Sequence, residues 1–200
     1  MVAMDQPATI DPDRRRARGA TTNLAGRYDL ARTEDHDGWD IPEARPAFDT
    51  RVTEEQPRSL ITYNRSPDLP FDRSINPYRG CEHGCIYCFA RPTHAYLGLS
   101  PGLDFETRLI ARPGAADVLR RELGARGYKV ATLAIGTNTD PYQPIERDRA
   151  ITRSCLQVLS AFNHPVGIVT KGALVERDID ILAPMAGQGL VRVGITITTL

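Results

Sequence analysis

In the second half of the chain, continuous apolar runs typical of buried strands alternate with segments whose apolar spacing is typical of helices. Continuous apolar runs at 129–136, 165–170 and 190–197 predict buried strands. A helix is expected from Pro113 to near Gly127, with proline early and glycine late. A second helix should begin near Asp148, and a short third one should cover 178–183. The second helix has one apolar face, formed by Ile151, Cys155, Val158, Leu159 and Phe162. Alternation of strand and helix implies right-handed crossovers and a parallel sheet, so an α/β fold is expected.

The first part of the chain lacks such a pattern. Residues 1–57 contain scattered prolines, an arginine cluster at 14–18 and an acidic patch at 34–37, with no sustained period. They are expected to form a disordered or extended N-terminal arm, and the arginine cluster is better explained as a solvated tail than as a nucleic-acid contact. Residues 58–80 are rich in turn formers and predict a loop leading into a short strand. Two regions are therefore expected, an arm at 1–57 and an α/β domain at 58–200.

The predicted α/β domain looks incomplete. About four strands and three helices are expected, which is half of an eight-unit barrel or two-thirds of a six-unit one. The last predicted strand would be an open edge of a parallel sheet, a form that proteins usually cover. We therefore expect an N-terminal fragment of a longer protein, in which catalysis by residues 1–200 alone is less expected than catalysis by the parent chain. Sequencing the gene past codon 200 would test this expectation.

Composition narrows the function classes. The chain has 25 Lys and Arg against 25 Asp and Glu, so its formal net charge is zero. This balance argues against binding nucleic acid through bulk charge, although a local basic groove remains open. No run approaches the roughly 18 apolar residues of a membrane span, and the N-terminus lacks the order of a signal peptide. A cytoplasmic protein without membrane association is expected.

Three of the four cysteines stand close together. Cys81, Cys85 and Cys88 form a C-x₃-C-x₂-C run in a glycine-bearing loop. Three thiolates can hold three irons of a [4Fe–4S] cluster and leave the fourth iron open to another ligand. A zinc site with His83 or His94 as the fourth ligand is the first alternative, but a second ligand pair is missing from the sequence. An electron-transfer cluster and a chance group of core cysteines are the others, and the spacing favours iron–sulfur.

With Tyr87 before its last cysteine, this run resembles the signature of radical S-adenosylmethionine (SAM) enzymes. The resemblance implies a partial (β/α)₆ TIM-type barrel, of which three to four βα units would be present, with the active site at the carboxyl ends of the strands. It implies a [4Fe–4S] cluster on the three cysteines, SAM on the open iron, and a reductant such as flavodoxin or ferredoxin. The reduced cluster would cleave SAM to a 5′-deoxyadenosyl radical that abstracts a hydrogen atom from substrate. Tyr87 would pack near the adenine.

A closer resemblance covers roughly residues 58–200. Four stretches are similar to the spore photoproduct lyase-like branch, often labelled DNA repair photolyase-like: DLPFD (68–72), SINPYRGC (74–81), YCFARP (87–92) and GTNTDPYQP (136–144). A lyase-like enzyme is implied. Its substrate is unknown, and nucleic acid is one candidate. The alternative is a non-enzymatic metal module that holds zinc or an electron-transfer cluster.

Polar residues at the ends of the predicted strands are candidate SAM contacts. After the strand at 129–136 stand Thr137, Asn138, Thr139 and Asp140, which supply small side chains, donors and acceptors. An ordinary turn would use the same residue types for conformational reasons. The next two strands end at Lys171 and Thr196. Lys171 would neutralise a carboxylate or phosphate, and the alternative for both residues is a solvated or sheet-facing side chain.

Thr137 departs from the lyase pattern, and three further residues are expected to have structural roles. In the lyase family a cysteine at the end of the second strand returns a hydrogen atom to the product radical, and Thr137 stands at the matching position. An O–H bond is too strong for that step, so repair of spore photoproduct itself is not expected. Arg91 and His94 are expected to support the cysteine loop. Cys155 is expected to be a core residue.

Overall fold

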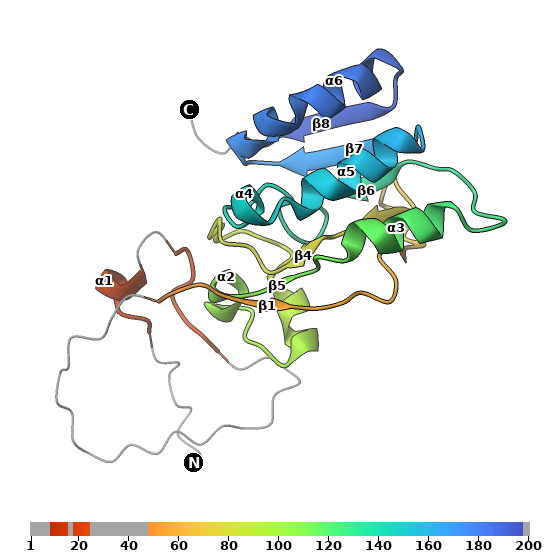
Figure 1. Cartoon of the computed structure of the whole chain (residues 1–200). Helices are drawn as coiled ribbons and strands as arrows, with labels where there is room; N and C mark the ends of the chain where they lie inside the picture. Colours follow the sequence, from red (N-terminus) through yellow and green to blue (C-terminus); the bar gives the residue numbers. More distant parts are fainter. Residues whose placement is uncertain (1–8, 16–17, 25–47, 198–200) are drawn as a thin grey trace, which may run out of the picture. The chain divides into compact units, whose positions relative to one another are not determined.

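The computed structural model describes residues 9–15, 18–24 and 48–197 (Figure 1). The chain divides into two compact units, each taken separately below. The first comprises Met1–Val52 and Gly80–Leu109, and the second comprises Thr53–Arg79 and Ile110–Leu200. The segment 80–109, which carries the cysteine loop, is therefore an insertion in the second unit.

The second unit is built on a five-stranded sheet with the order β2-β3-β6-β7-β8. These strands are β2 (Thr62–Tyr63), β3 (Arg73–Ile75), β6 (Leu133–Ile135), β7 (Val166–Thr170) and β8 (Val191–Ile195). Strands β3, β6, β7 and β8 run parallel, and β2 is antiparallel to β3. The register places Ile75 opposite Ile135, and Ile135 opposite Ile168. The prediction of an α/β fold with a parallel sheet is confirmed.

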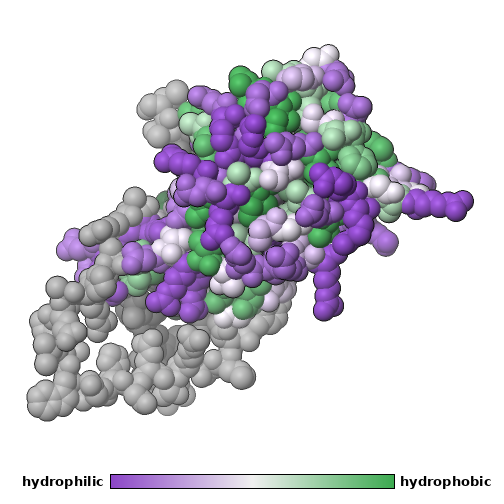
Figure 2. All heavy atoms as spheres, in the orientation of Figure 1, coloured by the Kyte–Doolittle hydropathy of each residue, from purple (hydrophilic) through white to green (hydrophobic). Residues whose placement is uncertain are grey.

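Helices lie along this sheet between its strands. They are α3 (Ala115–Leu123), α4 (Glu146–Arg149), α5 (Ile151–Ala161) and α6 (Ile179–Gly187), with a 3₁₀ helix η2 (Ala173–Asp178) before α6. Figure 1 shows α5 next to α3, and α6 beside β8. The buried face of α5 includes Ile151, Cys155, Val158 and Leu159, as its sequence predicts. Phe162, expected on the same face, follows the end of the helix and is exposed. Apolar residues also reach the surface over α6 (Figure 2), where Ile179 is 64% exposed.

Several predicted boundaries move. The strand expected at 129–136 is shorter, covering Leu133–Ile135, and the helix expected at 178–183 extends to Gly187. The helix expected from Asp148 is divided in two, because Ala150 adopts a left-handed backbone with φ 50°. The predicted strand at 165–170 is confirmed almost to the residue.

A second sheet has three strands in the order β1-β5-β4. They are β1 (Arg51–Glu54), β5 (Arg108–Ala111) and β4 (Tyr78–Arg79), and β4 pairs antiparallel with β5. The short strand expected at the end of residues 58–80 corresponds to β3 and β4, whereas β1 and β5 were not predicted as strands. β1 also lies inside the region expected to be an arm.

The first unit contains few regular elements. They are α1 (Pro12–Arg15), the 3₁₀ helix η1 (Arg91–Leu97) and α2 (Asp104–Thr107), with an isolated bridge between Thr9 and Thr22. Much of the arm expected at 1–57 lies outside the described residues, so its disorder stays a prediction. Among the described residues, no helix is long and apolar enough to cross a membrane.

Candidate functional site

The cysteine run forms an irregular loop in the first unit, as predicted. It begins at Gly80, whose φ of 78° lies in the left-handed region. A Cβ on Gly80 would also lie 2.8 Å from the carbonyl oxygen of Phe105, so glycine is needed here for both conformation and space. The next residue, Cys81, donates its N–H to the same Phe105 oxygen at 2.9 Å. The start of the loop is therefore fixed against α2.

The three thiols of the loop differ in exposure. Cys81 is 7% exposed and packs with Ala90 and Phe105, while Cys85 and Cys88 are partly exposed. All four cysteines of the chain lie in the described part, and none forms a disulfide. Within residues 9–15, 18–24 and 48–197, no three Cys, His, Asp or Glu side chains are gathered as a metal-ligand group.

The donor set nevertheless fits an iron–sulfur cluster. Three thiol side chains project from one short loop, and two of them have solvent access, so they can turn toward a common ligand. Gly84, with φ 63°, gives the loop its tight path between Cys81 and Cys85. Thiolates are the ligands that such clusters use.

Arg91 supports the cysteine loop as expected, whereas His94 contacts residues of α2 and β5. Arg91 donates from Nε and Nη2 to the carbonyl oxygen of Cys85, at 3.1 and 2.9 Å. His94 is 1% exposed, and its Nε2 donates to the carbonyl of Arg108 at 2.9 Å. Its ring packs edge-on against Phe105 with centroids 5.4 Å apart.

The aromatic residue of the signature is on the surface of its unit. Tyr87 is 62% exposed, and its neighbours Ile86 and Phe89 are 77% and 78% exposed. The adenine contact expected of Tyr87 stays a prediction.

In the second unit, the loop after β6 is tied to the strands on both sides. Its first residue, Gly136, has φ 92°, and a Cβ there would lie 2.0 Å from the carbonyl oxygen of Val169. On one side, Asn76 after β3 accepts the N–H of Asn138 at 3.1 Å and lies 3.4 Å from the hydroxyl of Thr137. Asn76 therefore connects the ends of β3 and β6, although the sequence indicates only a turn at this residue.

On the other side, Asp140 ties the loop to the end of β7. Its carboxylate accepts the Thr170 hydroxyl at 2.6 Å, the Lys171 N–H at 2.9 Å and the Tyr142 N–H at 2.8 Å. Thr139 is 6% exposed, and its hydroxyl accepts a hydrogen bond from Gln143 at 3.0 Å. Thr139 therefore makes a contact within its own turn, whereas Asp140 makes one such contact and two contacts with the end of β7.

The remaining predicted contacts lie at neighbouring strand ends. Lys171 directly follows β7 and Thr196 directly follows β8, where the Thr196 N–H donates to the Thr170 carbonyl at 2.8 Å. The carboxyl ends of β6, β7 and β8 thus bring Thr137, Asp140, Lys171 and Thr196 to one edge of the sheet. Contact of these residues with SAM stays a prediction.

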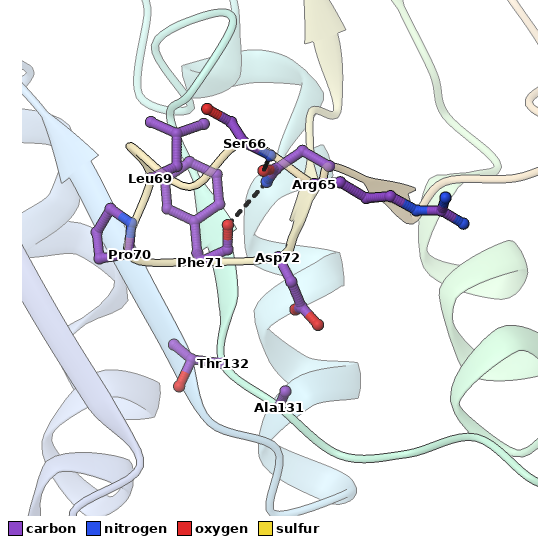
Figure 3. A pocket seen from close by; sticks show the side chains of 9 residues that line it. Arg65, Ser66, Leu69, Pro70, Phe71, Asp72, Ala131 and Thr132 are labelled. Atoms are coloured by element: carbon purple, nitrogen blue, oxygen red, sulfur yellow. Dashed lines mark hydrogen bonds between the residues drawn. The ribbon is translucent and has the colours of Figure 1, made fainter.

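A hollow lies at the amino ends of β3 and β6. It has a volume of about 560 Å³ and is lined mainly by the loop between β2 and β3 and by the residues before β6 (Figure 3). Leu69 and Phe71 lie on one side of it, and the Asn64 amide donates to the Phe71 carbonyl at 2.8 Å. It holds none of the predicted site residues.

A buried ionic cluster, which the sequence does not predict, holds the helices of the second unit in place. Glu146 and Asp178 are both fully buried. Arg177 donates to both carboxylates, at 2.7 Å and 2.8 Å, and Arg153 donates to Asp178 at 2.8 Å. Burial acts to raise the pKa of Asp178, but hydrogen bonds from these two arginines hold it below the ordinary value.

Several uncharacterized proteins are similar in sequence to this chain. An uncharacterized protein of Mycobacterium tuberculosis is 41% identical over 155 residues, which is 76% of this chain and 45% of the relative. An uncharacterized protein of Mycobacterium bovis matches to the same extent. One from Methanocaldococcus jannaschii is 26% identical over 123 residues, covering 62% of this chain and 43% of the relative.

The chain thus spans a little under half the length of the curated relatives it matches. No solved structure shows significant similarity to it. Residues 75–200, which include the three loop cysteines and the ends of β6, β7 and β8, match the radical SAM superfamily. The chain therefore belongs to the radical SAM superfamily.

Proposed function

We propose that this chain is the cluster-binding part of a radical SAM enzyme. Cys81, Cys85 and Cys88 would hold a [4Fe–4S] cluster, whose open iron would bind SAM. When loaded and reduced, this group supplies reductive cleavage of SAM to methionine and a 5′-deoxyadenosyl radical, which abstracts hydrogen from substrate. The observation that carries the proposal is three thiols on one loop within the region that matches the superfamily.

The residues of the chain would position and enclose these groups. Arg91 fixes the backbone of Cys85, and Gly80 with Phe105 fixes that of Cys81. Asp140 holds the ends of β6 and β7 in one arrangement, so that the backbone and side chains of Thr137, Asn138 and Lys171 can present donors and acceptors to SAM. The barrel that would surround these residues is part of this proposal.

We also propose a place in the spore photoproduct lyase-like branch, with a different final step. The proposal is supported by the four stretches at 68–72, 74–81, 87–92 and 136–144. Thr137 has no S–H bond from which a product radical could take a hydrogen atom. The substrate class of the enzyme would be nucleic acid. The hydrogen atom that the product radical takes up would come from a group other than residue 137.

Anaerobic reconstitution tests the proposed function. The full chain should bind about four irons and show the brown absorbance of a cluster. With dithionite and SAM it should form 5′-deoxyadenosine, measured by liquid chromatography. Cys85→Ala should abolish cluster and product, whereas Cys155→Ala removes a thiol outside the loop and should keep both.

Other outcomes would contradict the proposal. About one zinc per chain without a chromophore would favour the non-enzymatic metal module. A stable cluster that never cleaves SAM, also in the longer relatives, would favour electron transfer.

A further inference from the structure

The first unit contains a fully buried carboxylate that the proposed chemistry does not use. Glu106, in α2, is 0% exposed, and it forms an ion pair with Arg91 through Nη2. A buried charge is costly unless it is paired and hydrogen-bonded, so such a residue indicates a specific structural role. The same guanidinium holds the Cys85 carbonyl through Nη2 and Nε, and that of Gly102 through Nη1 at 3.1 Å. Glu106 thus acts on the cysteine loop through Arg91.

The other hydrogen bonds of Glu106 come from a distant part of the chain. Its carboxylate accepts the N–H of Gly19 at 3.0 Å and that of Ala20 at 2.9 Å. Its main-chain carbonyl accepts Nη1 of Arg18 at 2.8 Å. All of these groups belong to the first unit. We call residues 18–23 the strap.

The strap lies directly against the cysteine loop. A Cβ on Gly19 would be 1.8 Å from the carbonyl oxygen of Gly84 and 2.9 Å from the side chain of Ile86. Gly84 directly precedes Cys85, so the two backbones approach each other within the C-x₃-C spacing. Only glycine leaves room for this approach. Ala20, the next residue of the strap, is 8% exposed.

Both ends of the strap are fastened. At its beginning, Nη2 of Arg18 donates to the Thr50 hydroxyl at 2.7 Å, and this hydroxyl donates to Glu82 of the cysteine loop at 2.5 Å. At its end, Asn23 exchanges two hydrogen bonds with Asp104, at 3.1 and 2.9 Å. The strap is therefore held on the loop and on α2 at several points.

We propose that Arg91 and Glu106 are positioning residues for the cysteine loop and that the strap locks them in place, so that it controls access to the thiols and the lifetime of the bound cluster. This inference rests on the proposed cluster site. Outer hydrogen bonds of this kind orient ligands and tune metal sites in general. A bidentate guanidinium is suited to hold a carboxylate and a carbonyl together, which a lysine cannot do.

The test uses a variant that changes the strap and leaves the loop sequence intact. Gly19→Ala places a methyl group against the Gly84 carbonyl and should lift the strap. Thr21→Ala is the matched control, because its side chain is exposed and its backbone is unchanged. Circular dichroism should show that both variants keep the fold.

Two readouts are independent of enzyme activity. In the cluster-free chain, iodoacetamide should label Cys85 and Cys88 about tenfold faster in Gly19→Ala, because local opening of the strap becomes easier. Cys155, which is 0% exposed, should stay unlabelled in both proteins and so show that the rest of the fold remains closed. In the reconstituted chain, exposure to air should bleach the cluster about tenfold faster in the same variant, for the same reason. The control should match the wild type in both.

Further variants keep the proposal falsifiable if Gly19→Ala fails to fold. Asn23→Ala removes only the outer fastening and should speed labelling about threefold by the same local opening. Arg91→Lys keeps a positive charge beside Glu106 but loses the planar guanidinium. Its cluster should bleach faster in air than that of the wild type, whereas bleaching at the wild-type rate would indicate a purely electrostatic role.

The outcomes separate the two proposals. Faster labelling in Gly19→Ala with no iron in the wild type would support the strap and overturn the cluster function. A wild type that binds iron and cleaves SAM, with labelling and bleaching unchanged in Gly19→Ala and Asn23→Ala, would overturn the strap.

Discussion

Cys155 stands apart from the three loop cysteines, because it belongs to a helix and is fully buried. It lies on the inner face of α5 and is 0% exposed, and burial, with a smaller effect of Glu146, raises the pKa of its thiol to about 12. The thiolate is the reactive form of cysteine, so this residue is chemically quiet at neutral pH. Its role as a core residue was predictable from the helical spacing of apolar residues.

Iodoacetamide at pH 8 should therefore label Cys85 and Cys88 in the native cluster-free chain and leave Cys155 unlabelled until the protein is unfolded. Peptide mapping by mass spectrometry measures this. Because the folded pKa lies above the ordinary value of 9.0, the contribution of Cys155 to stability is present below pH 9 and is lost as the pH rises toward 12. Labelling of Cys155 as fast as Cys85 in native protein would contradict its burial.

Gly136 shows a residue whose type is fixed by a close backbone approach. We expect Gly136→Ala to lower the free energy of unfolding by at least about 1–3 kcal/mol, since alanine would be strained at φ 92° and would collide with the Val169 carbonyl. Urea denaturation measures the change. Gly187→Ala is the control, because a Cβ there meets nothing within 4 Å. Equal stability of the two variants would argue against this contact.

Sequence reasoning found the strand-end residues without their partners. The run 137–140 was recognised from its residue types and its place after a strand. Which of these side chains serve the fold could not be predicted, because the partners of Asp140 at Thr170 and Lys171 belong to another strand. The contacts of Asn76 could not be predicted for the same reason, because its partners follow another strand. Nothing in the sequence around Glu106 indicates that this residue is buried and contacts residues 18–20.

At the scale of elements, the division of the helix near Ala150 has a physical cause. Glu146, in α4, accepts the N–H groups of Thr152 and Arg153 at 2.9 and 3.2 Å. These amides stand in the first turn of α5, where no helical carbonyl is available to them. The chain must turn at Ala150 to bring them to the carboxylate. The apolar pattern predicted one continuous helix because this cap is made by a side chain outside the usual capping position.

The buried cluster around Asp178 should make stability depend on pH. Asp178→Asn should cost roughly 3 kcal/mol at pH 7, because it removes a fully buried charge to which both Arg153 and Arg177 donate. The folded pKa of Asp178 lies below its ordinary value of 3.8, so its contribution is present above that pH and is lost as the pH falls through the folded value. The wild type and the variant should therefore converge in acid.

Thermal unfolding at a series of pH values measures this effect. Asp117→Asn is a suitable control, since Asp117 is 86% exposed and pairs only with Arg120, and it should change stability by less than about 1 kcal/mol. A constant difference between wild type and Asp178→Asn down to pH 3 would contradict the ionised state of Asp178.

At the scale of the whole chain, zero formal charge limits how a nucleic-acid substrate could be bound. We expect the full chain to bind a nonspecific DNA duplex more weakly than about 10⁻⁴ M at physiological salt, because few phosphates would be neutralised. Fluorescence anisotropy with a labelled duplex, at two salt concentrations, measures this. Micromolar binding with a steep salt dependence would instead indicate a local basic groove.

The parallel α/β class of the main sheet was predictable, whereas its strand order and the second sheet were not. Hydrophobic patterns predicted three strands and three helical segments. Their alternation implied the parallel pairing that β6, β7 and β8 show. Strands β1, β2 and β4 are too short to show a pattern, and their pairing depends on partners far along the chain. The strap was not predictable for the same reason, since its contacts join residues that lie far apart in the sequence.

The strap also affects how the protein would be trimmed for expression. The superfamily match begins at residue 75, whereas the strap lies at 18–23 and its support at Thr50. A boundary chosen from that match would keep every cysteine of the loop and discard the segment that covers it. Such a truncated product would offer its thiols to oxidation during purification, and a failed preparation would reflect the choice of start codon rather than the chemistry of the loop.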